Sequence, residues 1–162
     1  MTDEASAPRK VTKLELLESA PHFSYFEYEE KQRLVPYLTA HKFMPGDFLI
    51  TEGEAMSVAY FILSGRVEVL KGNVDGDRRR LAELGGGQIV GEGALIPFGQ
   101  HASTVLIRTR EKVIALGLAA EKFADLTIND PQLAYKILYD IIRLLRQRLN
   151  EVSNRLADTI AD

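Results

Sequence analysis

Short apolar runs with a period of two, separated by turns rich in glycine, fill the chain from His41 to Leu116. Successive side chains of a strand point to opposite faces, so this period favours β-strands over helices. The expected strands are 41–43, 48–51, 58–63, 66–71, 79–84, 89–90, 104–107 and 113–116. Many short strands between turns are typical of a β-sandwich or barrel.

Helical patterns flank the β-rich segment on both sides. We predict helices over 13–20, 29–38 and 119–126 from the spacing of their apolar residues. Asp130 and Pro131 suit a helix cap and the first helical position. No glycine or proline follows them, which predicts one helix of about 30 residues and roughly 45 Å.

This long helix carries two apolar stripes. The stripe of Ile137, Ile141 and Leu144 ends halfway along the helix. The other keeps a heptad spacing to the end and consists of Leu138, Ile142, Leu145, Leu149, Val152 and Leu156. A heptad seam suits pairing with a second helix. We therefore predict that the first half packs on the β-domain and that two copies form a parallel homodimer along the seam. The alternative is a helix that lies on its own domain throughout.

The glycine-rich stretch from Gly85 to Val105 is the most informative about chemistry. The segment from Gly91 to Leu95 is long enough for about one helical turn. Small residues there let a ligand approach the backbone, and the unpaired N–H groups of a helix start favour an anion. Glu92 adds a carboxylate that suits a hydroxyl group beside that anion. The alternative is a glycine-rich turn with a solvated Glu92.

This stretch resembles the phosphate-binding cassette of the cyclic nucleotide-binding domain family, which includes bacterial regulators of the catabolite activator type and kinase regulatory subunits. Residues 81–95 read Leu-Ala-Glu-Leu-Gly-Gly-Gly-Gln-Ile-Val-Gly-Glu-Gly-Ala-Leu, close to the family pattern. The turns near Gly46, Gly53 and Gly65 extend the resemblance.

The resemblance implies a mainly β fold: an antiparallel β-roll of the jelly-roll type (double-stranded β-helix), with N-terminal helices and a long C-terminal dimerisation helix. The expected organisation is a flexible tail over 1–12, a cyclic nucleotide-binding-like β-roll domain over 13–128 and the long helix over 129–162.

By position, the resemblance implies a ligand site formed by Val90, Gly91, Glu92, Gly93, Ala94, His101, Ala102 and Ser103. In the family the cassette glutamate, here Glu92, accepts a hydrogen bond from the ribose 2′-hydroxyl. The amides of Ala102 and Ser103, or the Ser103 hydroxyl, are further candidates to reach the phosphate.

Four positions depart from the family. Members that bind nucleotide have an arginine on the cyclic phosphate, where this sequence has His101. Arginine is always charged and offers a planar fork, whereas histidine is mostly neutral at pH 7. Gly93 stands where the family usually has a larger apolar residue. Arg148 and Leu149 occupy the place of the Thr-Ser pair that contacts adenine in the catabolite activator.

Three interpretations follow, each of a non-enzymatic regulatory module with an unidentified downstream protein partner. The first is a sensor of a cyclic nucleotide (cAMP or cGMP) with His101 in the phosphate role. The second is a sensor of another small anion or organic acid in the same pocket. The third is a degenerate or repurposed pocket in a domain used for dimerisation or protein interaction.

Composition and charge argue against other classes of protein. A net charge of −3 gives no reason to expect nucleic acid or an anionic membrane as a partner. The only basic cluster, Arg78–Arg80, is interpreted as a solvated strand edge. The chain has no cysteine, and its three histidines lie far apart, so no metal site is expected.

Targeting signals are not apparent. No apolar run approaches the ~20 residues of a membrane span, and the N-terminus lacks a signal-peptide pattern. We therefore expect a cytoplasmic location. No residues remain for a winged helix-turn-helix, so direct DNA binding by this chain is not expected, whether it is a stand-alone sensor or a fragment.

Overall fold

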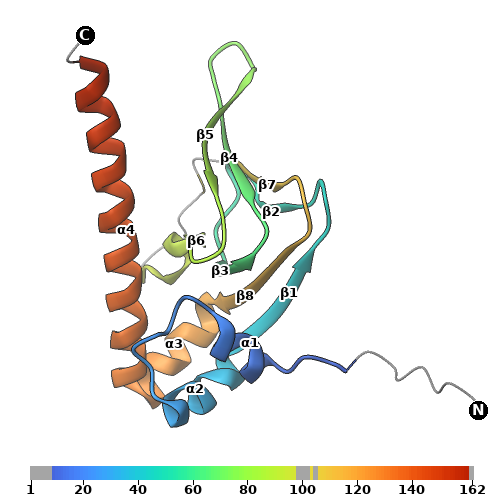
Figure 1. Cartoon of the computed structure of the whole chain (residues 1–162), viewed down its shortest axis with the longest axis vertical. Helices are drawn as coiled ribbons and strands as arrows, with labels where there is room; N and C mark the ends of the chain where they lie inside the picture. Colours follow the sequence, from blue (N-terminus) through green and yellow to red (C-terminus); the bar gives the residue numbers. More distant parts are fainter. Residues whose placement is uncertain (1–8, 98–102, 104–105, 161–162) are drawn as a thin grey trace, which may run out of the picture.

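The computed structural model describes residues 9–97, 103 and 106–160. In the described part, two four-stranded antiparallel sheets and four α-helices are formed (Figure 1). The elements are α1 (Lys13–Ser19), α2 (Tyr28–Leu34), the 3₁₀ turn η1 (Val35–Tyr37), β1 (Leu38–Phe43), β2 (Phe48–Ile50), β3 (Val58–Ser64), β4 (Val67–Gly72), β5 (Arg78–Leu84), β6 (Ile89–Val90), the 3₁₀ turn η2 (Glu92–Leu95), β7 (Leu106–Thr109), β8 (Val113–Ala119), α3 (Ala120–Asn129) and α4 (Pro131–Ile160).

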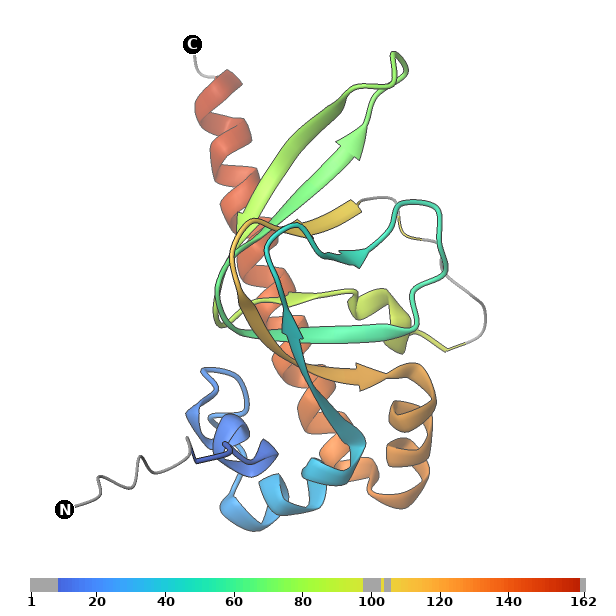
Figure 2. The same ribbon diagram turned by 90° about the vertical axis from the view of Figure 1, so that its right-hand side faces the viewer.

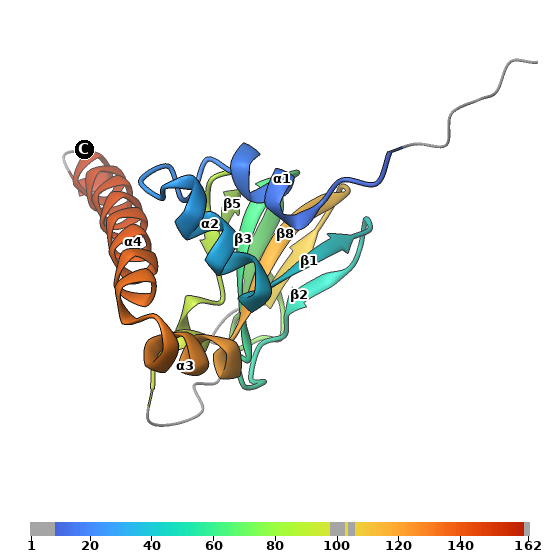
Figure 3. The ribbon, with the colours of Figure 1, turned by 90° about the horizontal axis from the view of Figure 1, so that it is seen from below.

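The strand order of the first sheet is β1-β8-β3-β6, and that of the second is β2-β7-β4-β5. Helices α1, α2 and α3 gather at the same end of the molecule as the first turns of α4 (Figures 1 and 3). The predicted fold class, an antiparallel β-roll with flanking helices and a long C-terminal helix, is confirmed. Strand β5 lies at a sheet edge, as expected for Arg78–Arg80, and β4 and β5 form a projecting hairpin (Figure 2).

Strands β3, β6 and β8 of the first sheet are buried on both faces, because they separate two apolar clusters. Phe61 of β3 and Leu116 of β8 pack against the helices, in the cluster that also holds Ile137 and Ile141 of α4. Ile62, the neighbour of Phe61, packs instead against the second sheet. This double burial explains why the sequence of β3 is apolar at almost every position.

Several predicted boundaries were wrong, among them the end of the second helix and the end of the last strand. The helical pattern over 29–38 ends at Leu34, and Leu38 begins β1, opposite Leu118. Pro36 has no amide hydrogen and cannot continue an α-helix, so the chain passes through a 3₁₀ turn there. Strand β8 runs to Ala119 instead of ending at Leu116. Gly117 pairs with Thr39 and Tyr60 inside this strand, and glycine suits the position because a Cβ atom there would lie 2.6 Å from Nε2 of His41.

Helix α4 has 30 residues, as predicted, and its two halves differ in exposure. In the first half the predicted packing stripe is buried, with Ile137 fully covered and Leu144 partly covered. Every residue from Leu149 to Ile160 is exposed, and this half stands clear of the sheets (Figure 1). None of the described helices is long and apolar enough to cross a membrane.

Candidate functional site

A cavity of about 400 Å³ lies where the second sheet, β6, η2 and the middle of α4 meet. Figure 1 shows β6 and η2 beside the middle of α4. The cavity is lined by Ile50, Met56, Val69, Leu84, Val90, Gly91, Glu92, Gly93, Ile96, Ser103, Ile107, Leu145 and Arg148. Its size is in the range of sites for small organic ligands, and its wall is mostly apolar with a few polar groups.

Gly91 fixes the backbone at the floor of this cavity. Its φ of +72° lies in the left-handed region that favours glycine. A Cβ atom on Gly91 would lie 2.6 Å from the carbonyl oxygen of Val58 and 2.9 Å from Cδ1 of Ile50. Both the conformation and the space therefore require glycine where β6 ends and η2 begins.

Gly93 is required less strictly, because its neighbour is flexible. A Cβ atom on Gly93 would lie 2.4 Å from Cε and 3.4 Å from Sδ of Met56. The end of the Met56 side chain thus occupies the space that a larger residue at position 93 would need. Met56 also lines the cavity, and sequence reasoning missed it because no motif marks a methionine that fills a gap.

This contact predicts a coupled pair of substitutions. Gly93→Leu should reduce the free energy of unfolding by about 1–3 kcal/mol, because the new side chain overpacks against Met56. In a Met56→Ala background the same change should cost less than about 1 kcal/mol. Urea unfolding of the four proteins of this double-mutant cycle measures the coupling. Equal costs in both backgrounds would contradict the assigned contact.

Glu92 and Arg148 place opposite charges on the wall of the cavity. No described residue forms a hydrogen bond or ion pair with the Glu92 carboxylate. Arg148 reaches in from α4, and its Nη2 donates to Oε1 of Gln88 at 3.1 Å and to the Ile89 carbonyl at 2.8 Å. The sequence singled out both residues, but it did not predict that Arg148 of α4 forms a hydrogen bond with Ile89 of β6.

His22, which precedes α2, also forms a hydrogen bond with Gln88. Nε2 of His22 lies 3.0 Å from the Gln88 carbonyl oxygen, and the side chain is buried. Burial lowers the pKa of His22 below its usual value, against the opposing effects of the Gln88 hydrogen bond and the Asp140 charge. His22 is therefore neutral at pH 7, and its Nε2–H donates because a carbonyl oxygen only accepts.

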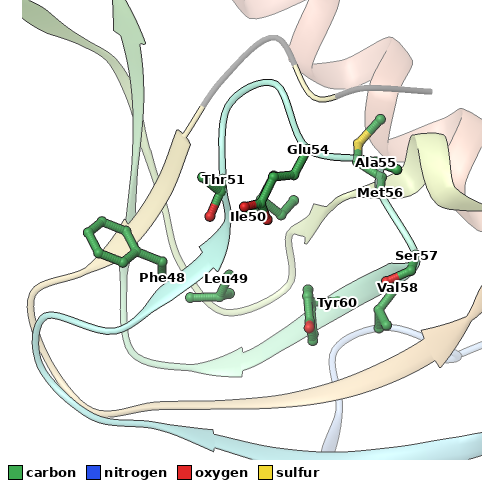
Figure 4. A pocket seen from close by; sticks show the side chains of 10 residues that line it. All are labelled: Phe48, Leu49, Ile50, Thr51, Glu54, Ala55, Met56, Ser57, Val58 and Tyr60. Atoms are coloured by element: carbon green, nitrogen blue, oxygen red, sulfur yellow. The ribbon is translucent and has the colours of Figure 1, made fainter. Parts of the chain in front are cut away.

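A second hollow of about 230 Å³ shares Ile50 and Met56 with the cavity. Its polar lining consists of Thr51, Glu54, Ser57 and Tyr60, and Figure 4 shows Glu54 reaching back toward Thr51 and Ile50. Burial raises the pKa of Tyr60 above its usual value. None of the described residues that line this hollow is basic, so it is the poorer candidate for an anionic ligand.

The structure brings together five of the eight predicted site residues. Val90, Gly91, Glu92, Gly93 and Ser103 line the cavity, whereas Ala94 lines an adjacent hollow beside α3. His101 and Ala102 lie outside the described residues. The Ser103 amide, expected to reach a phosphate, instead donates to the Glu54 carbonyl at 2.9 Å. Nowhere in the described residues do three or more histidine, aspartate or glutamate side chains form a cluster that could hold a metal ion.

One residue of the predicted helix seam packs inside the protomer instead of lying on its surface. Leu145 is half-buried and lines the cavity, so it does not lie wholly on the seam surface. The other five seam residues, Leu138, Ile142, Leu149, Val152 and Leu156, are exposed.

Comparison with known proteins adds independent findings. A model of the family described as "Cyclic nucleotide-binding domain" matches residues 40–130. The chain is 36% identical over 101 residues to a cAMP-dependent protein kinase regulatory subunit of Yarrowia lipolytica, a match covering 62% of this chain and 26% of that protein. It is 26% identical over 132 residues to the cyclic AMP receptor protein of Thermus thermophilus, covering 81% of this chain and 60% of that protein. The chain thus spans less than two thirds of either relative.

Among solved structures, a cyclic nucleotide-binding domain from Methylobacillus flagellatus aligns with a TM-score of 0.77 at 25% identity. This alignment covers 90% of this chain and 81% of that one. The catabolite activator protein of Thermus thermophilus aligns with a TM-score of 0.65 at 25% identity, over 86% and 62% of the two chains.

Proposed function

This chain belongs to the cyclic nucleotide-binding domain family, and we propose that it is a non-enzymatic sensor of a cyclic nucleotide. The observation that carries the proposal is one cavity in which the unpaired Glu92 carboxylate faces a wall shared by the cassette and α4. A carboxylate with no partner among the described residues is suited to accept hydrogen bonds from a ligand hydroxyl.

Three of the predicted site residues have distinct roles in this proposal. Glu92 accepts a hydrogen bond from the ribose 2′-hydroxyl, and Gly91 keeps the backbone open for the ligand. His101 donates to the cyclic phosphate and is charged more fully when the phosphate is bound. The apolar wall, which includes Met56 and Ile96, encloses the rest of the nucleotide.

The signal leaves the site through α4, in a homodimer formed by the seam residues. A ligand in the cavity contacts η2 on one side and Leu145 or Arg148 on the other. It therefore favours one position of α4 relative to the β-roll, and the pairing of the two helices follows that position. Such coupling requires that the ligand binds the two arrangements with different affinity.

The test is calorimetric titration of the purified protein with cAMP and cGMP at pH 6 and pH 8. If a bound phosphate raises the pKa of His101 by about one unit from about 6.5, affinity at pH 6 should be roughly six times that at pH 8. His101→Arg should bind more tightly at both pH values, because its charge is permanent. It should also remove the pH dependence, which separates His101 from His22 and His41.

Two other outcomes have defined meanings. Binding by His101→Arg alone would show an intact pocket that is disabled at one position. Binding by neither protein would contradict the proposed function. It would favour a sensor of another small anion, or a repurposed pocket in a domain used for dimerisation or for interaction with an unidentified protein partner.

A further inference from the structure

We propose that Arg148 makes the site selective for a cyclic nucleotide whose purine carries an oxygen at C6, so that cGMP is preferred to cAMP. This selectivity rests on the proposed function, since it names the ligand of the same cavity. Three observations on Arg148 support it: its place in the cavity, its lack of a charged partner, and the hydrogen-bonding character of its side chain.

Arg148 lies in the cavity wall contributed by α4, whereas Glu92 belongs to the wall contributed by the cassette. The two residues line one continuous cavity, so a ligand held by its ribose at Glu92 extends its base toward α4. Arg148 and Leu145 are the two α4 residues that line the cavity, and Leu145 has no polar group. Arg148 is therefore the α4 side chain that forms hydrogen bonds with the base.

The guanidinium of Arg148 has no acidic partner among the described residues. Its Nη2 bonds only to neutral oxygens, those of the Gln88 side chain and the Ile89 carbonyl. Its Nε is buried and finds no acceptor in the described part of the chain. Partly buried cations are usually paired with a carboxylate or another acceptor. Both N–H groups of Nη2 are thus engaged and Nε is covered, whereas Nη1 has no hydrogen-bond partner among the described residues, and its two N–H groups are available to acceptors of a ligand.

The chemistry of the two purines then decides between them. Arginine has five N–H donors and no acceptor. Guanine presents two adjacent acceptors, O6 and N7, whereas adenine presents N7 beside a donating 6-amino group. The Nη1 group of Arg148 donates to the adjacent acceptors of guanine, but it would leave the adenine amino group facing another donor. A well-placed contact of this kind discriminates between bases by about 5- to 150-fold.

The experiment compares cGMP, cIMP and cAMP by calorimetric titration of the full chain. Cyclic IMP has the O6 and N7 acceptors of guanine but lacks its 2-amino group. We expect cGMP and cIMP to bind at least about fivefold more tightly than cAMP. A preference for cGMP that cIMP does not share would overturn the assignment, because the 2-amino group would then be the group that is recognised.

Two variants test the role of Arg148 itself. Arg148→Thr, whose hydroxyl both donates and accepts, should bring the cGMP/cAMP affinity ratio close to one while the protein stays folded by circular dichroism. The matched control is Arg146→Thr, an exposed arginine of the same helix, which should keep the wild-type ratio. If Arg148 contacts the phosphate instead, Arg148→Thr will weaken all three nucleotides equally, and the proposal fails.

Failure of the inference and failure of the proposed function are distinguishable. Equal affinities for the three nucleotides, or a preference for cAMP, in the wild-type protein would overturn only the role of Arg148. Absence of binding for every nucleotide, with His101→Arg also inactive, would overturn the proposed function and the selectivity together.

Discussion

Gly91→Ala is expected to abolish nucleotide binding and to lower the free energy of unfolding by about 2–5 kcal/mol. Alanine in the left-handed conformation costs about 1–2 kcal/mol. Its Cβ would also meet the Val58 carbonyl oxygen at 2.6 Å, a contact with rigid backbone that adds an overpacking cost of about 1–3 kcal/mol. Relief of the contact would move β6 away from β3 and distort the floor of the cavity. Urea unfolding and calorimetric titration with cGMP and cAMP measure the two effects.

Gly46→Ala is the matched control for this substitution. Gly46 has a φ of +90°, but no atom lies within 4 Å of the place its Cβ would take. It should therefore show only the conformational cost of about 1–2 kcal/mol and normal binding. If the two variants are equally stable, the close approach to Val58 does not constrain position 91, and the explanation of the cassette geometry is wrong.

Leu149→Arg is expected to convert a homodimer into monomers, with a dissociation constant raised by roughly a hundredfold or more. The seam would then bury an unpaired charge from each copy, which costs several kcal/mol. Leu149 is 64% exposed in the protomer, so the change does not disturb the core. Sedimentation equilibrium on the wild type and the variant measures the difference.

Asn150→Arg serves as the control for the seam. This neighbour is also exposed but lies off the heptad positions, so the same charge should leave the dimer intact. A wild-type protein that stays monomeric at high concentration would refute the predicted homodimer. A Leu149→Arg protein that dimerises normally would show that the copies associate through another surface.

The fold was largely predictable because its strands and helices have distinct apolar periods. The apolar run that predicted a strand over 58–63 is β3, whose Phe61 and Ile62 pack on opposite faces, and the absence of glycine and proline after Pro131 predicted the full length of α4. The errors came from residues whose secondary structure depends on contacts with residues that are distant in the sequence. Leu38 fitted a helical stripe, but its partner Leu118 is distant in the sequence.

The site was predictable only where glycine and charge mark it. The pattern around Gly91 and Glu92 located the cassette, and both residues line the cavity. Met56 could not be predicted, because its contact with Gly93 depends on how a loop 37 positions earlier folds back on η2. In the sequence, Arg148 was notable only because it stands where the catabolite activator has one residue of its Thr-Ser pair. Its bonds to Gln88 and Ile89 show that α4 and β6 are joined directly at the cavity.

Arg148 is also the point at which α4 leaves the body of the protein, because every residue from Leu149 to Ile160 is exposed. The remaining twelve positions form a rigid arm of about 18 Å beyond this fulcrum. A tilt of about 10° at Arg148 therefore displaces Ile160 by roughly 3 Å, by the geometry of a straight helix. If the proposed ligand tilts α4 at the cavity, the free half of the helix therefore turns a small movement near Arg148 into a larger displacement at Ile160.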